Sequence, residues 1–515
     1  MRTFAVALLL TAMAGLIAFS SLQRPASQAN ATENLPLREF HVHHEHVLGT
    51  SLELFVVAKD LATSDDVEHA VLAEIERLRM VFSLYDPTSE LSRLNRTREP
   101  MSVSPEMIEV LKLYSVWQER TGGVLHSQVG GLVELWKKAE KEQREPDASA
   151  LSAVAESLQR PGYALDAEAN KVTRLSDQPL NLNAIAKGYI IQKATAAARQ
   201  VGGAKGMLLN LGGDMSAWGV DSAGQPWAVG IQDPHDPHDN ARPIASLLLK
   251  DQAIASSGGY ERFYTIQGKQ YSHLFDPRTG RSATGAAGAT VIAADNTTAN
   301  ALATTLCILS PEEGLKLVSR CEGVECLIVD RNGTQHRSPR FASLERKLPD
   351  LEFVAAEQDA KADPWPAGYQ VQMTVTLPES NAGKRYRRPY VAVWAENADG
   401  KAVRTITEWG NNPRWISTLP QWWKLAKNDA ALVKAVSRAT RSPGKHSIVW
   451  DGKDDKGKPL PQGTYTIHVE VHREHGKLVQ QTGKIVCGAE GAKVVLEKNA
   501  ETGDTVVEYA KKKAP

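Results

Sequence analysis

Three segments between residues 255 and 310 bring together side chains that can carry chemistry. They read SSGGYERF, KQYSHLFDPRTG and VIAADNTTANALATTLCILS, so glycine turns, arginines, one histidine and a Thr/Asn-rich helix start lie close in the chain. Phosphoryl transfer to a hydroxyl needs positioning, charge stabilisation and a proton acceptor. The segments NLNAIAKGYI and LLNLGGDM favour the same chemistry, because helix starts and glycine turns let a phosphate approach backbone N–H groups.

Each motif also has a structural interpretation. The Gly-Gly pair of LLNLGGDM can simply serve a tight turn, and NLNAIAKG can be an ordinary strand-to-helix transition. Neither matches the Walker or Rossmann phosphate loops. His273 can be a surface or core histidine, but Arg262, Asp276 and Arg278 lie close to it in the sequence. A carboxylate beside His273 would raise its proton affinity, so we expect Asp276 to tune a histidine base.

Asn300 and Thr304 lie one turn apart on the helix that the third segment predicts. Two side-chain oxygens on one face can help to hold a hard cation such as Mg²⁺. A Thr/Asn-capped helix with a solvated face explains the same residues without a metal.

Composition restricts the classes of function. The chain has 515 residues, 60 of them basic and 60 acidic, and its formal net charge is zero. This length favours two or three domains. The balanced charge argues against a nucleic-acid-binding protein, which needs clustered excess Lys and Arg.

The N-terminus has the pattern of an export signal. Arg2 precedes an apolar run from Phe4 to Phe19, and Ala29-Asn30-Ala31 forms an A-x-A cleavage site. We expect residues 1–31 to be a cleaved signal peptide and the protein to be periplasmic. An uncleaved inner-membrane anchor is the alternative, because the apolar run approaches spanning length. Membrane contact would then come only from this segment or from a partner.

Apolar periodicity predicts the remaining organisation. Helices are expected over 65–82, 105–120, 184–200, 298–309 and 312–318, and strands over 47–58, 178–182, 207–211, 227–231, 246–249, 253–256 and 325–329. This mixture predicts a layered α+β domain over 36–345. A linker at 346–366 precedes alternating strands at 369–377, 390–395 and 464–470, which predict a small all-β, Ig-like sandwich domain over 367–490. Residues 491–515 are expected to be a frayed tail.

Taken in order, the motifs of the first 340 residues resemble those of the ApbE family of FAD:protein FMN transferases. The matching segments are Leu48-Gly49-Thr50, Ser83-Leu84-Tyr85, Ser89–Asn95, Val129–Trp136, Ile185–Gly188, Asn210–Asp214, Ser257–Arg262, Ser272–Gly280 and Thr298–Thr304. The region from 367 onwards resembles an uncharacterised β domain that is sometimes fused to these transferases.

The resemblance implies an ApbE-like α+β fold and a reaction. FMN is transferred from FAD to a threonine or serine hydroxyl of an exported acceptor protein with a Ser/Thr-Gly-Ala-Thr-type motif, and AMP is released. It implies that FAD is contacted by Leu48, Tyr85, Val124, Leu125, His126, Asn181, Lys187 and Phe275. It also implies a Mg²⁺ ion at the carbonyl of Ala184 and the side chains of Asn300 and Thr304. His273 is then the base, and Arg262 and Arg278 stabilise phosphoryl charge.

Several residues depart from the family pattern. Asn300, Asn181 and His126 stand where the family has carboxylates, Leu48 replaces a methionine, and Gly259 precedes Tyr260. The loss of negative charge at Asn300 predicts weaker metal binding. Two alternatives therefore stay open: a pyrophosphatase that splits FAD into FMN and AMP, and a flavin-binding protein with reduced catalysis.

The chain contains four cysteines. Cys321 and Cys326 are close enough in sequence to bridge in an oxidising compartment, and buried free thiols are the alternative.

Overall fold

The computed structural model describes residues 36–259, 262–346, 363–379, 388–410, 413–429, 432–433, 436–474 and 476–512. The signal segment expected at 1–31 lies outside these residues. Within them, no helix combines the length and apolar character needed to cross a bilayer.

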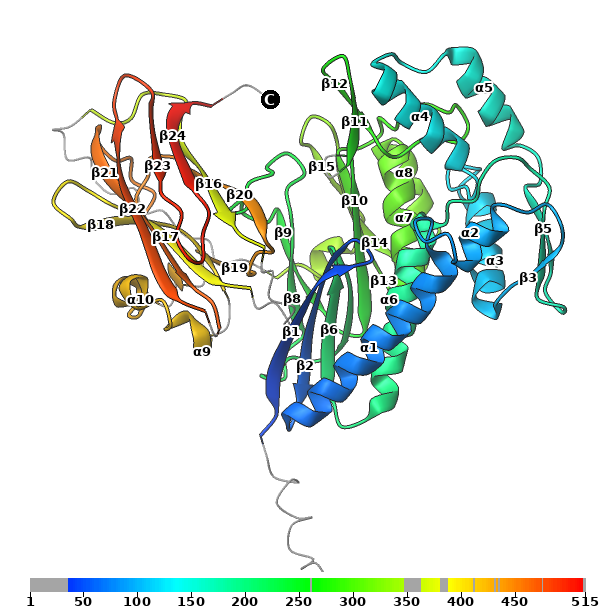
Figure 1. The fold of residues 1–515 in the computed structure, drawn as a ribbon, viewed down its shortest axis with the longest axis horizontal. Helices are drawn as coiled ribbons and strands as arrows, with labels where there is room; N and C mark the ends of the chain where they lie inside the picture. The colour runs from blue at the N-terminus through cyan, green and yellow to red at the C-terminus, as the bar shows by residue number, and fades with distance from the viewer. Residues whose placement is uncertain are drawn as a thin grey trace, which may run out of the picture.

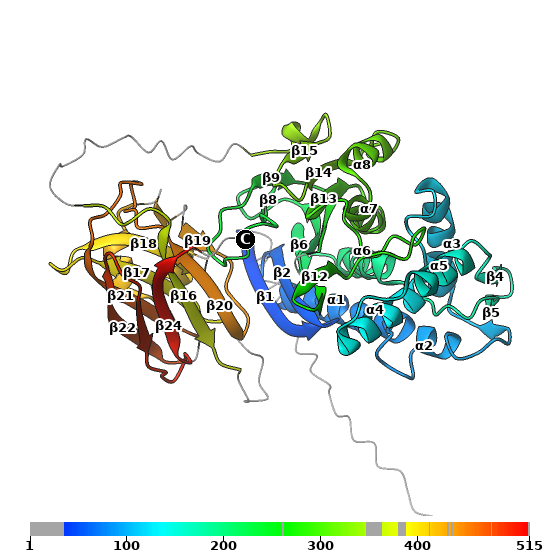
Figure 2. The ribbon, with the colours of Figure 1, turned by 90° about the horizontal axis from the view of Figure 1, so that it is seen from above.

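The N-terminal domain is built on an eight-stranded antiparallel sheet (Figures 1 and 2). In spatial order its strands are β1 (Arg38–Val47), β2 (Thr50–Ala58), β6 (Gly206–Leu211), β7 (Asp214–Gly219), β10 (Gln252–Gly258), β13 (Gly288–Ala293), β14 (Glu325–Val329) and β15 (Gln335–Arg337). The single strand expected at 47–58 is instead the second half of a hairpin. Leu48 (φ 51°) and Gly49 (φ 77°) form its turn, and positive φ at both positions suits a two-residue hairpin.

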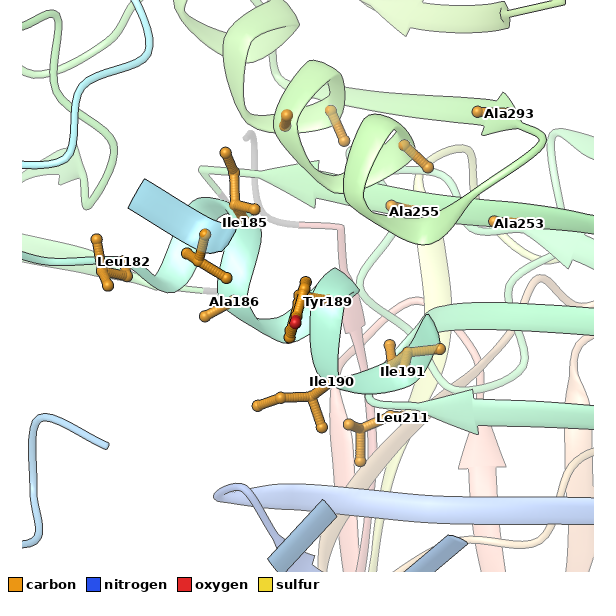
Figure 3. Close-up of a cluster of buried hydrophobic side chains, with 14 of the residues drawn as sticks. Leu182, Ile185, Ala186, Tyr189, Ile190, Ile191, Leu211, Ala253, Ala255 and Ala293 are labelled. Carbon is orange, nitrogen blue, oxygen red and sulfur yellow. The ribbon is translucent and has the colours of Figure 1, made fainter. Parts of the chain in front are cut away.

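Helices cover one face of this sheet. They are α1 (Leu61–Phe82), α6 (Asn183–Val201), α7 (Asn296–Ile308) and α8 (Pro311–Val318), and most of the main core lies between them and the strands. Figure 3 shows Ile191 of α6 with Leu211 of β6, Ala253 and Ala255 of β10, and Ala293 of β13, all of which belong to this core. Small side chains at these strand positions leave room for the helices to approach the sheet closely.

The opposite face packs on β8 (Trp227–Ile231), β9 (Ala245–Leu249) and the 3₁₀ turn η1 (Phe341–Ser343), which form a second core. The α+β layering expected from the sequence is confirmed.

Smaller elements extend beyond the helical layer. They are α2 (Glu90–Leu94), β3 (Met101–Ser102), α3 (Pro105–Arg120), α4 (Gly130–Glu142), α5 (Ala148–Ser157), β4 (Tyr163–Asp166), β5 (Lys171–Arg174), and a hairpin of β11 (Phe263–Ile266) and β12 (Lys269–Ser272). The strand expected at 178–182 is wrong. Its backbone N–H groups bond to loop partners, since Leu180 N donates to Asn95 Oδ1 (2.8 Å) and Asn181 N to Ser127 O (2.7 Å).

The C-terminal domain consists of two packed antiparallel sheets with one short parallel pairing. One contains β20 (Gly444–Trp450), β16 (Tyr369–Leu377), β24 (Thr505–Lys511) and β23 (Ala492–Leu496). The other contains β19 (Ser437–Arg438), β18 (Ala402–Trp409), β17 (Tyr390–Glu396), β21 (Gly463–His472) and β22 (Leu478–Cys487). Side chains of both sheets share one core, and α9 (Pro413–Ile416) and α10 (Pro420–Ala426) pack on the outer face of the second sheet. The expectation of a small β domain is confirmed.

Two expected boundaries of this domain are wrong. The supposed tail 491–515 contains β23 and β24, and Val507 and Tyr509 are fully buried. Trp365, assigned to the linker, packs against Trp450, Tyr465 and Tyr509 in the core. Both errors come from residues whose burial depends on strands far away in the sequence.

A loop of the first domain pairs with the edge strand β20 of the second. Asn240 Nδ2 donates to Val449 O (2.8 Å) and Asn240 Oδ1 accepts from Val449 N (3.0 Å), so its amide imitates a neighbouring strand. Asp239 adds a backbone bond to Ser447 O (2.7 Å) and an ion pair with Arg441 (2.7 Å).

The cysteines are free thiols. Cys321 and Cys326 form no bridge, and burial raises the pKa of the Cys326 thiol to about 12.

Candidate active site

The turn between β6 and β7 holds a charged pair. Lys187 Nζ of α6 lies 2.8 Å from Asp214 Oδ2 and 3.1 Å from Gly212 O. Asp214 is only 3% exposed, and its other oxygen accepts from Ser256 N (3.1 Å) on β10. The turn therefore fixes an ammonium group next to a buried carboxylate.

Glycine is required in this turn. Gly212 has a φ of 54°, and a Cβ built on it would lie 2.4 Å from Thr50 Oγ1. Thr50 follows the turn that carries Leu48, so the β1–β2 and β6–β7 turns pack against one another. Leu48 and Lys187, far apart in the sequence, thus lie at the same end of the sheet.

Asn300 of α7 reaches the same carboxylate. Its Nδ2 donates to Asp214 Oδ2 (3.2 Å) and its Oδ1 accepts from Gly188 N (3.2 Å). A helical N–H at residue 188 points toward the carbonyl of Ala184, four residues earlier. The amide oxygen of Asn300 and the carbonyl of Ala184 are therefore neighbours, and Thr304 lies one helical turn further along α7.

These groups are of the kinds that Mg²⁺ prefers. The donors are a carboxylate, an amide oxygen, a carbonyl and a hydroxyl, and Asn300 Oδ1 keeps a second lone pair. The described residues contain no cluster of three or more His, Cys, Asp or Glu suited to a metal. Asp214 is the carboxylate that contacts Asn300.

Asp295 is the acidic residue nearest to Asn300 in the sequence and could compensate for the carboxylate that is missing there. In the structure, Asp295 caps α7 by accepting from Thr298 N (2.8 Å), and it also accepts from the Thr297 hydroxyl. Asp214 is the acid that contacts Asn300, and it was missed although it ends the NLGGD motif.

His273 has a fixed tautomer. Its Nδ1 lies 2.9 Å from the backbone carbonyl of Arg262, and a carbonyl can only accept, so Nδ1 carries the proton. Nε2 of the neutral ring keeps its lone pair. Burial lowers the pKa of His273 and the nearby Arg262 charge lowers it further, which outweighs the opposite effect of the carbonyl bond. The ring is therefore neutral at neutral pH.

The expectation that Asp276 raises the proton affinity of His273 is wrong. Asp276 pairs with the exposed Arg278 (Nη2–Oδ2 2.8 Å), and this pairing raises the pKa of Arg278. The positive charge of Arg278 is thereby compensated within its own turn. Arg262 is exposed, and its charge is felt at His273.

An aromatic group surrounds Phe275. This buried ring stacks with Trp136 (centroids 5.8 Å apart) and with Tyr264 (6.0 Å). The pKa of Tyr264 is raised by burial, then by Glu140 and by Tyr85, so Tyr85 lies near the group. Tyr85 itself is 84% exposed, which leaves its ring free to stack on a ligand.

Val124, Leu125 and His126 are buried. His126 Nδ1 accepts from Gln128 N (3.1 Å), so Nε2 carries the proton and donates to Leu158 O (3.1 Å). Burial lowers the pKa of this histidine, which is neutral and has both nitrogens engaged. Its edge lines a shallow pocket with Ser115, Gln118, Ser127, Gln128, Gln159, Arg160, Pro161, Gly162 and Tyr163.

Asn181 connects this pocket to α6. Its backbone N–H bonds to Ser127 O, and its Oδ1 accepts from Asn183 N (3.2 Å) at the first helical residue. The helix start is thus partly satisfied by the preceding asparagine, three residues before Ala184.

The His273 region and the Asp214 region are joined by β10. Ser256 binds Asp214, and a Cβ on Gly259 would lie 3.1 Å from Ser272 Oγ, next to His273. Three residues of extended chain separate Ser256 from Gly259, roughly 10 Å. The histidine and the charged turn therefore lie within the reach of one dinucleotide.

Comparison with known proteins identifies the family of the first domain. The sequence model of the ApbE family matches residues 48–328. This chain belongs to the ApbE family. A FAD:protein FMN transferase of Treponema pallidum is 30% identical over 60% of this chain and 90% of its own length. One of Klebsiella pneumoniae is 27% identical over 66% of this chain and 97% of its own length.

Solved structures agree as well. The ApbE protein of Thermotoga maritima superposes with a TM-score of 0.55 at 28% identity, covering 60% of this chain and all of that one. The flavin transferase ApbE of Vibrio cholerae has a TM-score of 0.51 at 24% identity and the same coverage, which establishes a common fold. Residues 370–504 match a second family, described as "Predicted periplasmic protein (DUF2271)".

Proposed function

We propose that this member of the ApbE family transfers the FMN part of FAD to a serine or threonine hydroxyl of an exported acceptor protein. Curated relatives that this chain matches over most of their own length are named for that activity. The observation that carries the proposal is the tautomer of His273, because a neutral ring with Nε2 unprotonated can accept a hydroxyl proton.

The chemistry is a substitution at phosphorus. The acceptor oxygen forms a bond to the FMN phosphorus, and the bond from that phosphorus to the bridging pyrophosphate oxygen breaks. AMP leaves with the electron pair, and the hydroxyl proton goes to His273 Nε2. The ammonium group of Lys187 and the guanidinium of Arg262 supply positive charge for the phosphate oxygens.

FAD is the substrate, and the residues expected to contact it are those that the resemblance implies. Tyr85 offers an exposed ring for the flavin, and Lys187 offers a fixed charge for the pyrophosphate. A bound Mg²⁺ would neutralise pyrophosphate charge, and Ala184, Asn300 and Thr304 would hold it beside Asp214.

The compartment and the acceptor complete the proposal. An N-terminal signal at residues 1–31 and the match of the second domain to a family described as periplasmic support export to the periplasm. The acceptor is an exported protein with a Ser/Thr-Gly-Ala-Thr-type motif.

The test uses the purified mature chain with FAD, Mg²⁺ and a threonine-containing acceptor peptide. Transfer predicts a peptide mass increase equal to FMN, with AMP formed in equal amount only when the peptide is present. AMP formed equally well without the peptide would identify a hydrolase instead.

Variants connect this reaction to His273. His273→Ala should lower the rate about 100- to 10 000-fold, the usual contribution of a general base, while FAD binding is retained. His336→Ala is the matched control, because that histidine pairs with Asp330 on another edge of the sheet.

A further inference from the structure

The C-terminal domain inserts one arginine into the first domain. Arg388 precedes β17, and its side chain is only 7% exposed. Its guanidinium donates to Glu45 Oε1 (3.2 Å) and Glu53 Oε1 (2.8 Å) of the first domain. Thr440 O (3.0 Å) and Ser442 Oγ (2.6 Å) of its own domain accept two further N–H groups.

Glu53 continues the contact toward the candidate site. It lies on β2 and is 6% exposed, and its second oxygen accepts from Asn210 Nδ2 (3.2 Å). Asn210 Oδ1 in turn accepts from Gly213 N (3.0 Å). Gly212 O, in the same turn, accepts from Lys187 Nζ. Hydrogen bonds and the backbone between Gly212 and Gly213 thus connect Arg388 with Lys187.

The two glutamates need this cation. Burial alone would raise the pKa of Glu45, but the hydrogen bond from His43 and the charge of Arg388 together hold it at about 2. Asn210 is neutral and cannot replace the guanidinium at Glu53. A buried carboxylate that loses its counter-charge takes up a proton or moves toward water. Movement toward water would take the Glu53 oxygen away from Asn210 Nδ2, and protonation would weaken that hydrogen bond.

We propose that Arg388 is a positioning residue, through which the C-terminal domain holds the NLGGD turn in the arrangement that Lys187 and Asp214 require. These contacts support the positioning of the turn by Arg388. The effect of Arg388 on turnover rests on the proposed function. The second domain then contributes to the active site without touching the substrate.

The simpler interpretation is that Arg388 only fastens the domains together. The interface offers a matched control for this, the ion pair of Arg441 with Asp239 (2.7 Å). Arg441 also joins the two domains, although 22% of its side chain is exposed against 7% for Arg388. Its charge acts on Glu53 without forming an ion pair with it, and its partner Asp239 contacts Ser447 and His446 rather than the NLGGD turn.

The experiment compares Arg388→Gln, Arg388→Lys and Arg441→Gln in the full mature chain. The first readout is hydrogen exchange of the Gly213 amide, whose proton Asn210 accepts. Loss of one such bond corresponds to an exchange rate about five- to tenfold higher. We expect this acceleration in Arg388→Gln, a smaller one in Arg388→Lys, and a change of less than about twofold in Arg441→Gln.

The second readout is the split between kcat and KM for FAD-dependent AMP release. A misaligned turn should lower kcat about five- to tenfold in Arg388→Gln with KM for FAD changed less, because alignment matters most in the transition state. Arg388→Lys should recover part of the loss, and Arg441→Gln should keep the wild-type kcat.

Equal effects of Arg388→Gln and Arg441→Gln on both readouts would overturn the proposal in favour of simple fastening. Unchanged Gly213 exchange in Arg388→Gln would overturn it directly. If Arg388→Gln does not fold, Ser442→Ala removes one acceptor of Arg388 without a change of charge, and it should accelerate Gly213 exchange in the same direction. Wild-type protein that releases no AMP would disprove the transferase function, whereas the exchange comparison needs no turnover.

Discussion

The ammonium group of Lys187 and the carboxylate of Asp214 form a 2.8 Å ion pair between α6 and the start of β7. Lys187→Met would leave that carboxylate buried with Asn300 Nδ2 and Ser256 N as its hydrogen-bond partners among the described residues. Because Lys187 is itself 30% exposed, solvent screening reduces the loss, and we expect about 1–2 kcal/mol of destabilisation. The urea midpoint at pH 7 measures it.

The control for this prediction is Lys193→Met on the same helix. Lys193 pairs with Glu109, and both side chains are more exposed, at 37% and 51%. Its loss should cost less than about 0.5 kcal/mol. Equal destabilisation by the two substitutions would mean that the ion pair with the buried Asp214 contributes no more to stability than the exposed pair with Glu109.

Asn300→Asp should couple stability to Mg²⁺. The new carboxylate would face Asp214, to which Asn300 Nδ2 now donates at 3.2 Å, and two carboxylates this close repel each other. Without metal at pH 8 the variant should unfold at a lower temperature than the wild type. Added Mg²⁺ should raise its unfolding temperature more than that of the wild type.

Asn296→Asp serves as the comparison, because Asn296 is buried on the same helix but donates to Met215 O. It should gain no Mg²⁺-dependent stabilisation. A Mg²⁺ response in Asn300→Asp no larger than that of the wild type would rule out the proposed metal position.

His273 predicts the acid limb of the pH profile. The pKa of the ring is lowered in the folded protein, mainly by burial, so the neutral form persists below the ordinary histidine value of about 6.5. As pH falls, kcat/KM should stay constant to below 6.5 and then decrease as Nε2 becomes protonated. Rates measured from pH 5 to 8 test this, and an acid limb centred above 6.5 would contradict it.

Glu408 predicts a pH dependence in the C-terminal domain. Burial raises the pKa of this carboxyl to about 8, although the nearby Ser437 hydroxyl opposes the shift. In the unfolded chain the group titrates near 4.5, so the folded state binds more protons between these values. Stability should therefore fall as pH rises from about 5 to about 8.

Glu408→Gln keeps the shape of the neutral acid and should flatten this decline in urea unfolding. Glu470→Gln is the contrast, because that carboxylate accepts from Gln421 N (3.1 Å) and Trp422 N (2.9 Å), and its loss should destabilise the domain. A Glu408→Gln variant with the same pH dependence as the wild type would refute the assignment.

Sequence patterns predicted an element correctly where interactions between residues close in the sequence determine that element. Helix α3 begins and ends as expected, because Ser104 caps it by accepting from Met107 N and Pro105 occupies its first turn. Strand β16 also matches, because its strict alternation places every second residue in the core. The order of motifs was sufficient to identify the family.

Distant partners explain the errors. The 178–182 segment looks like a strand, but the side chain of Asn95 and the carbonyl of Ser127 take its N–H groups. Asp276 looked like the partner of His273, but Arg278, two residues later, binds it. Asp214 and Arg388 gain their significance only from contacts across the fold, which spacing along the chain does not reveal.

The pairing of Asn240 with Val449 has a consequence for solubility. Strand β20 is the border of its sheet, and an uncovered border offers a row of unsatisfied N–H and C=O groups to other chains. The amide of one loop residue occupies those groups at Val449. Without the first domain, the edge of β20 would be uncovered and could pair with other chains. The first domain therefore protects the C-terminal domain against self-association.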